Sequence, residues 1–200
     1  MDFSEQSHQT EVRASLDKIL REHCSQECLK EYDSNFKHDE NLLSLLSSNG
    51  YLGLGLNEKY GGSGEDLYDL GILFEQLGYH AAPLSLSGCL VDVAQTIQKF
   101  GNEKSCKDIL GSIIAGEIYT SAILEPSNQD PENPITTAKI ENDQLIISGT
   151  KYLSEISSMA KSILISVNSS EGVLLVLVES DKVQLTELSS TANSPIFKVE

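Results

Sequence analysis

The chain has 200 residues, 40% hydrophobic and 22% charged, which is ordinary for a globular protein of one large or two small domains. Its 30 acidic and 14 basic residues give a net charge of −16. This argues against nucleic acid and anionic membrane as partners, because both require a basic surface. No apolar run reaches the roughly 18 residues of a transmembrane helix. The N-terminus lacks the features of a secretory signal, so we expect a cytoplasmic protein.

Apolar residues recur at helical spacing through residues 1–117, which predicts an all-α bundle. Asp66 and Asn102 are predicted N-caps, and Asn49-Gly50 is a predicted helix end. The apolar stripes span residues 12–20, 42–46, 67–77, 90–100 and 106–113.

A glycine-rich segment, residues 58–64, separates two of these predicted helices. Its glycines indicate positive φ angles or a close approach of two backbone segments. It lacks the Gly-Lys-Ser/Thr ending of a phosphate-binding P-loop. By itself the segment therefore predicts a turn and no ligand.

From residue 118 the chain changes to short apolar or alternating runs joined by Asn, Ser and Gly, which are typical of strands. Residues 118–200 predict an antiparallel β domain, a barrel or sandwich, that is incomplete. Residues 173–178 are nearly all apolar, so we expect a strand buried on both faces. Helices followed by strands give an α+β fold class.

The four cysteines form no Cys-x-x-Cys pair. Cys24 and Cys28 lie one helical turn apart beside His23, but no second matching pair follows. We therefore expect reduced thiols and no metal site.

Several motifs occur in a specific order. They are Leu54-Gly55-Leu56, residues 58–64, a helix ending Glu75-Gln76-Leu77-Gly78, Ala122 to Pro126, Gly149-Thr150-Lys151, and Ala160 to Leu164. This order resembles the N-terminal helical domain and the middle β domain of the acyl-CoA dehydrogenases. The resemblance runs from about residue 10 to the end of the chain.

The resemblance implies FAD-dependent α,β-dehydrogenation of an acyl-CoA thioester, as in fatty acid metabolism, by a homo- or hetero-oligomer (dimer or tetramer). The first flavin-contacting segment would be residues 121–130 and the second residues 153–155. The cofactor-binding candidates are Ser121, Ile123, Leu124, Ser127, Asp130, Leu153, Ser154 and Glu155. The substrate-binding candidates are Ser87, Leu90, Val91, Ala94 and Asp130. An alternative interpretation makes all of these ordinary strand and helix-core residues.

The chain departs from the family pattern at these segments. Leu124 stands where the family usually has Thr, and residues 127–130 replace a Gly-x-Gly-Ser turn. Leu153-Ser154-Glu155 replaces Trp-Ile-Thr, which brings a carboxylate towards a ring that must accept hydride. We therefore predict a divergent member of the family.

The family's C-terminal helical domain, which supplies the catalytic base, has no counterpart in this sequence, and no catalytic residue is nominated. The alternative function is a non-catalytic partner subunit or scaffold of a heteromeric complex. The coding sequence after Glu200 would separate a fragment from a split subunit. We expect the 200-residue chain alone to be inactive and to hold FAD weakly or not at all.

Overall fold

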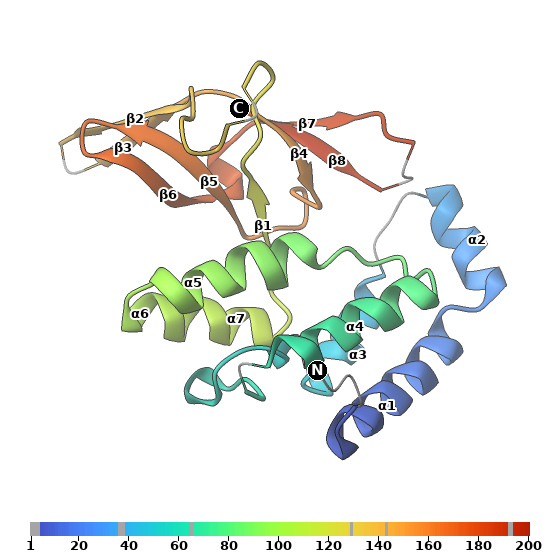
Figure 1. Cartoon of the computed structure of the whole chain (residues 1–200). Helices are drawn as coiled ribbons and strands as arrows, with labels where there is room; N and C mark the ends of the chain where they lie inside the picture. Colours follow the sequence, from blue (N-terminus) through green and yellow to red (C-terminus); the bar gives the residue numbers. More distant parts are fainter. Residues whose placement is uncertain (1–4, 36–38, 65, 129, 143, 192–193) are drawn as a thin grey trace. The chain divides into compact units, whose positions relative to one another are not determined.

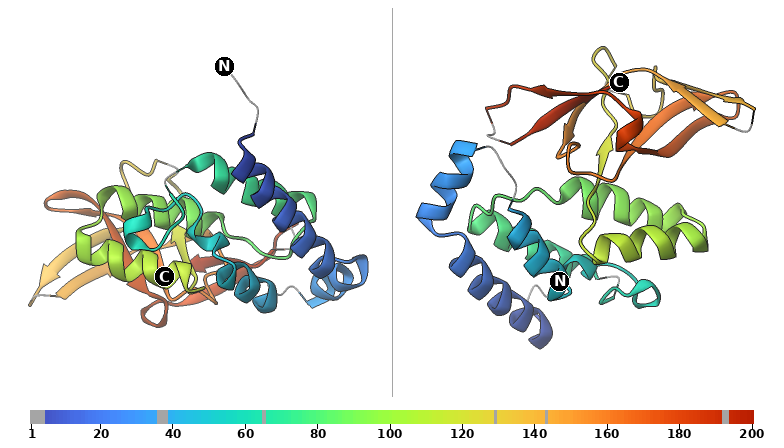
Figure 2. Two further views of the ribbon diagram at one scale, coloured as in Figure 1. Left: turned by 90° about the horizontal axis from the view of Figure 1, so that it is seen from below. Right: turned by 180° about the vertical axis from the view of Figure 1, so that it is seen from behind.

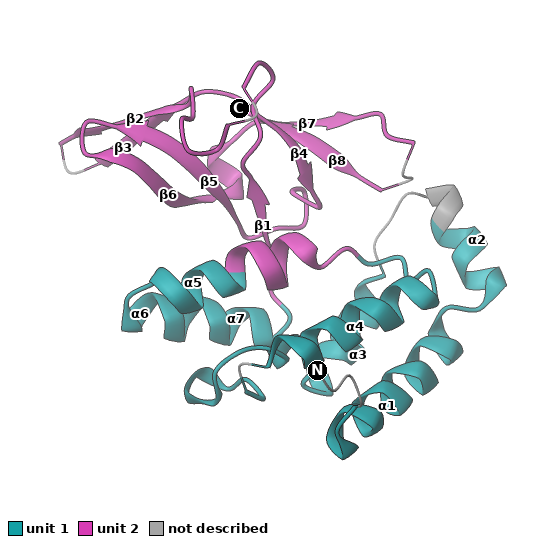
Figure 3. Cartoon of the chain, in the orientation of Figure 1, with its two compact units in different colours: residues 1–84, 94–116 teal, residues 85–93, 117–200 magenta. Residues whose placement is uncertain are grey.

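The computed structural model describes residues 5–35, 39–64, 66–128, 130–142, 144–191 and 194–200. It forms two compact units, which Figure 3 distinguishes by colour. Unit 1 comprises residues 1–84 and 94–116, and unit 2 comprises residues 85–93 and 117–200. Residues 85–93 thus group with the strands, although the sequence places them within a helical domain. The division of the parent protein into domains at residue 117 stays a prediction.

Unit 1 is helical (Figure 1). Its α-helices are α1 (Ser7–His23), α2 (Gln26–Asn35), α3 (Glu40–Ser48), α4 (Leu67–Tyr79), α5 (Ala94–Phe100), α6 (Glu103–Ser105) and α7 (Gly111–Ile114). Two 3₁₀ turns, η1 (Tyr51–Gly53) and η2 (Glu58–Tyr60), and a π-helical segment, η4 (Cys106–Leu110), complete it. The sequence did not predict α2 as a separate helix, because its polar residues show no clear apolar stripe.

The predicted helix caps of unit 1 are confirmed. The Asp66 carboxylate accepts the Tyr68 N–H at 2.8 Å, and the Asn102 side chain accepts the Ser105 N–H at 2.8 Å. Gly50 follows α3 with a φ of +79°. Asp66 and Asn102 thus pair backbone N–H groups that the start of a helix leaves unpaired. Gly50 takes the left-handed conformation that favours glycine at a helix end.

The glycine-rich segment folds back against the chain that precedes it. The Gly64 N–H donates to the Leu56 carbonyl at 2.9 Å, and the Ser63 N–H donates to the Gly53 carbonyl at 3.0 Å. A Cβ atom on Gly62 would overlap the Leu56 backbone. Close backbone approach therefore explains this glycine.

The core of unit 1 consists of leucine and isoleucine side chains from helices that are far apart in sequence. The fully buried ones include Leu16, Leu20, Leu42, Leu46, Ile72, Leu73, Leu110 and Ile113. These positions are the apolar stripes that predicted the helices.

Unit 2 contains the π-helical segment η3 (Gly88–Val93) and two sheets, seen from two further sides in Figure 2. The first sheet has the order β1-β5-β2-β3, with β6 on β5, and the second has the order β4-β8-β7. The strands are β1 (Tyr119–Ala122), β2 (Thr137–Glu141), β3 (Gln144–Ser148), β4 (Lys151–Glu155), β5 (Ser162–Ser169), β6 (Gly172–Glu179), β7 (Leu185–Leu188) and β8 (Ile196–Val199).

The core of unit 2 joins both sheets. It contains Ala122, Ala138, Ile163, Ile165, Val167 and Val199. Alternate residues of β5 point into this core, which is the period-2 pattern of a strand.

The α+β fold class is confirmed, whereas two details of the β domain are wrong. The first sheet is mixed, because β1 and β2 pair with β5 in parallel, and the described strands form no closed barrel. Residues 173–178 are not buried on both faces, since Val173 is 45% and Leu175 52% exposed. Strand β6 pairs with β5 among the described strands, so its other edge lies open. No helix in the described part of the chain is long and apolar enough to cross a membrane.

Candidate functional site

A cavity of about 220 Å³ lies within unit 2, where η3, β1 and β4 meet. It is lined by Ser87, Gly88, Asp92, Thr120, Ser121, Ile123, Leu124, Tyr152, Leu153 and Glu155. Pockets that enclose a small molecule usually measure roughly 300–1,000 Å³. This cavity can therefore cover only one end of a large ligand.

The cavity brings together several residues that the sequence analysis singled out. The predicted residues that line it are Ser87, Ser121, Ile123, Leu124, Leu153 and Glu155. The two segments around residues 121–124 and 153–155, far apart in sequence, thus face one space. Their proposed role in binding a cofactor stays a prediction.

Other predicted residues lie outside the lining. Ser154 is fully buried, and its hydroxyl donates to the Ser121 carbonyl at 2.7 Å. Leu90 and Ala94 are buried at 1% and 0% exposure, which suits core packing, whereas Val91 is 44% exposed. Gln129, within the first predicted segment, lies outside the described residues.

Four residues of the lining were not predicted, namely Gly88, Asp92, Thr120 and Tyr152. Asp92 lies four residues after Gly88, so in a helix its side chain lies on the same face as the Gly88 backbone position. This spacing was the available signal. Tyr152 was missed because β4, a short strand of mixed character, was not predicted.

Glu155 is the most contacted carboxylate of the cavity. Its Oε2 accepts hydrogen bonds from the Ser85 hydroxyl and, at 3.1 Å, from the Ser87 hydroxyl. Its backbone carbonyl accepts the Thr120 hydroxyl at 2.8 Å. The end of β4 is thereby joined to β1 and to the segment that leads into η3.

Asp92 forms a second serine–carboxylate pair, because the Ser121 hydroxyl donates to its Oδ2 at 2.5 Å. Gly88 packs so closely on β1 that an added Cβ would lie 2.7 Å from Thr120 Oγ1. The glycine therefore lets η3 approach the strand.

Among the described residues, none of those lining the cavity is a lysine, arginine or histidine.

Two exposed leucines belong to the apolar side of the lining. Leu124 is 40% and Leu153 52% exposed. The Tyr152 N–H donates to the Leu124 carbonyl at 2.8 Å, which joins the two segments at this wall. Leu153 has a φ of +58°, an unusual value for a residue with a branched side chain, next to a register shift in the β4–β8 pairing.

A buried ion pair joins the chain positions next to this wall, since Glu125 follows Leu124 and Lys151 precedes Tyr152. Lys151 Nζ lies 2.9 Å from Glu125 Oε1, and both side chains are 3% exposed. The ammonium also donates to the Ser166 hydroxyl at 3.1 Å and to the Ile123 carbonyl at 3.4 Å. The pair thus fixes the backbone just before Leu124.

The Glu125 carboxylate also accepts hydrogen bonds from the Thr136 N–H and the Ile135 N–H, each at 2.7 Å, and from the Thr136 hydroxyl at 2.6 Å. Burial raises the pKa of Glu125, but these bonds and the Lys151 ammonium outweigh it and lower the pKa to about 2. Glu125 is therefore ionised at neutral pH and serves as a structural anion.

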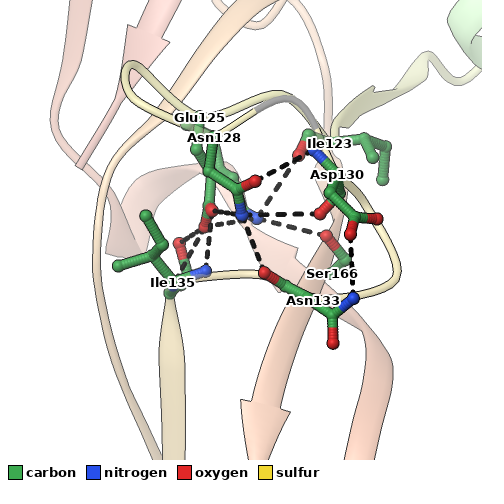
Figure 4. Close-up of polar contacts among 9 residues, drawn as sticks. Ile123, Glu125, Asn128, Asp130, Asn133, Ile135 and Ser166 are labelled. Carbon is green, nitrogen blue, oxygen red and sulfur yellow. Dashed lines mark hydrogen bonds and ion pairs between the residues drawn. The ribbon is translucent and has the colours of Figure 1, made fainter.

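The loop between β1 and β2 is closed by its own polar side chains, which Figure 4 shows around Asn128. Asn128 Nδ2 donates to the Asn133 carbonyl at 2.7 Å and to Glu125 Oε2 at 3.1 Å. The Asp130 carboxylate accepts the Glu132 N–H at 3.0 Å and the Asn133 side chain at 2.8 Å. Ser127 and Asp130 are exposed, and neither lines the cavity.

Two of the cysteines have thiols with raised pKa values. Burial raises the pKa of Cys24 and of Cys89 to about 11, so both thiols stay protonated at neutral pH. Within the residues that the structure describes, no group of three or more His, Cys, Asp and Glu side chains could hold a metal ion.

Residues 6–117 match the family model described as "Acyl-CoA dehydrogenase, N-terminal domain". Acyl-CoA dehydrogenase FadE12 of Mycobacterium tuberculosis is 30% identical over 138 residues, which are 68% of this chain and 36% of that protein. Acyl-CoA dehydrogenase FadE26 of the same organism is 27% identical over 62% of this chain and 32% of its own length. The matched region thus spans about a third of each curated relative.

Solved structures extend the similarity through unit 2. A variant of the Tcur3481-Tcur3483 steroid ACAD has a TM-score of 0.88 and 28% identity over 96% of this chain and 54% of that chain. The ChsE4-ChsE5 complex from Mycobacterium tuberculosis has a TM-score of 0.90 and 21% identity over 100% of this chain and 55% of that chain. This chain therefore spans about half the length of these structures.

Proposed function

This chain belongs to the acyl-CoA dehydrogenase family, and we propose that it takes part in FAD-dependent α,β-dehydrogenation of an acyl-CoA thioester. The observation that carries the proposal is the match of residues 6–117 to the family model. The cavity of unit 2 lies where the two segments that resemble the family's flavin-contacting segments meet, around Leu124 and Leu153. When bound, FAD would supply the oxidising chemistry, and the protein would supply orientation and electrostatics.

The apolar wall of the cavity suits the flat face of an aromatic ring, since Ile123, Leu124 and Leu153 all line it. The polar side does not fit a flavin. Asp92 and Glu155 place two carboxylates there, and negative charge beside a ring that must accept electrons opposes its reduction. The net charge of −16 further disfavours a pyrophosphate. No catalytic step is therefore assigned to a flavin in this cavity.

This misfit favours a second candidate function, a non-catalytic partner subunit of a heteromeric acyl-CoA dehydrogenase. In such an assembly another polypeptide would hold the flavin and supply the base. The 28% identical structure, of the Tcur3481-Tcur3483 steroid ACAD, is named after two proteins, which supports a two-polypeptide arrangement. Both candidates place the chain in a dehydrogenase and differ in which polypeptide carries the cofactor.

Co-expression tests the proposal. The chain is produced alone and together with the polypeptide encoded after Glu200, in frame or as the neighbouring gene. Dye reduction is then measured with acyl-CoA thioesters of increasing length and with a steroid CoA thioester, which is included because the 28% identical structure is that of a steroid ACAD. We expect activity that depends on this chain. Equal activity without it would refute the proposal.

A further inference from the structure

Two carboxylates that accept hydrogen bonds from serine hydroxyls occupy the polar side of the cavity in unit 2. Glu155 accepts from Ser85 and Ser87, and Asp92 accepts from Ser121. A serine hydroxyl has one proton to donate. All three hydroxyls thus give that proton to a carboxylate of the same chain, and the cavity presents acceptors where a flavin edge needs donors.

We propose that Glu155 excludes flavin from this cavity by holding Ser85 and Ser87, the residues that lead into η3, in hydrogen bonds to the end of β4. The inference rests on the proposed function, and it identifies the residue that decides which polypeptide of the assembly carries the cofactor. A flavin edge placed at this end would have to displace the bonds from Ser85 and Ser87. It would then leave the Glu155 carboxylate without its donors, which is unfavourable for a charged group away from bulk water.

Charge acts in the same direction as the hydrogen bonds. Asp92 and Glu155 are the two carboxylic side chains of the lining, and none of the lining residues is basic. The chain as a whole carries −16, so its long-range field does not offset them. An uncharged flavin would be opposed by the Glu155 carboxylate and its bonds to the serines. A flavin with phosphate groups would in addition be repelled by the net negative charge of the chain.

Glu155 also corresponds to a position where the family usually has threonine, a residue with a hydroxyl and no charge. Glu155→Thr therefore removes both the negative charge and the carboxylate that accepts the hydrogen bonds from Ser85 and Ser87. Glu155→Gln removes the charge but keeps a side-chain carbonyl that can accept from Ser85 and Ser87. The two variants separate the contributions of charge and hydrogen bonding.

The test is a fluorescence titration of the full chain with riboflavin, which is uncharged, and with FAD. The variants are Glu155→Thr and Glu155→Gln, and the matched controls are Glu187→Thr and Glu187→Gln, at an exposed position of β7. Circular dichroism checks that each variant is folded. If Glu155→Thr is unfolded, Glu155→Ala, which also removes both the charge and the hydrogen-bond acceptor, decides.

We expect no saturable binding of either flavin to the wild-type chain. Glu155→Thr should bind riboflavin at least about tenfold more tightly than the wild type, which corresponds to about 1.4 kcal/mol. Stoichiometric flavin binding by the wild-type chain would overturn the inference. So would a Glu155→Thr variant that binds riboflavin no more tightly than Glu187→Thr does. An assembly that lacks dehydrogenase activity would instead refute the proposed function, whatever these titrations show.

Discussion

Replacing Lys151 by methionine tests the part of unit 2 that supports the cavity wall. The substitution removes the ammonium beside Glu125 but keeps an unbranched side chain of similar length. Both partners are 3% exposed, so the change leaves a buried carboxylate without its cation. Lys151→Met also removes the donor of Ser166 and of the Ile123 carbonyl.

Removing one partner of a buried ion pair costs about 3–5 kcal/mol. Glu125 keeps its donors from Thr136 and Ile135, so we expect the lower end, about 3 kcal/mol. At roughly 2–4 °C per kcal/mol for a chain of this size, the melting temperature of unit 2 should fall by about 6–12 °C.

Urea and thermal unfolding followed by circular dichroism measure this loss. Lys139→Met, at an exposed position of β2, is the control and should change the unfolding free energy by less than about 0.5 kcal/mol. The double variant Glu125→Gln/Lys151→Met buries no charge, and should be more stable than Lys151→Met alone. A loss below about 1 kcal/mol for Lys151→Met would refute this account of the pair.

Three further predictions concern other parts of the chain. Because the folded-state pKa of Glu125 is about 2 against an ordinary 4.5, its stabilising effect is present above about pH 4.5 and is lost as the pH falls towards 2. The difference in unfolding free energy between the wild type and Glu125→Gln should therefore shrink between pH 6 and pH 3, and a constant difference would contradict this. Gly62→Ala should destabilise unit 1 by at least about 1 kcal/mol, since the new Cβ meets the Leu56 backbone; Gly111→Ala, where nothing lies within 4 Å, is the control in thermal unfolding. Ala94→Phe should cost about 1–3 kcal/mol by overpacking a fully buried site, and in the active assembly an altered chain-length preference without loss of stability would instead support a substrate pocket there.

The sequence predicted those parts of the fold that depend on local rules. Asp66 and Asn102 cap helices as expected, because capping requires only a side-chain acceptor next to the first turn. The exposure of Leu175 could not be predicted, because an apolar strand has the same composition at the edge of a sheet as at its centre. The parallel pairing of β1 with β5 depends on chain topology, which local patterns do not contain.

The cavity was predicted only in part, and the reason differs among its residues. Ser121 and Glu155 were found because they lie in motifs that resemble those of the family. Asp92 was missed, since a lone carboxylate on a helix is most simply a solvated residue. Its pairing with Ser121 arises from the packing of η3 on β1, which the sequence alone does not specify.

The visible spectrum of the purified assembly, recorded without oxygen before and after addition of an acyl-CoA thioester, tests the central claim most directly. The claim is that this chain takes part in FAD-dependent dehydrogenation. It predicts a flavin band that acyl-CoA bleaches when this chain is present together with the polypeptide encoded after Glu200, and no such band from this chain alone. An assembly without flavin, or one whose band acyl-CoA bleaches equally when this chain is left out, would contradict it.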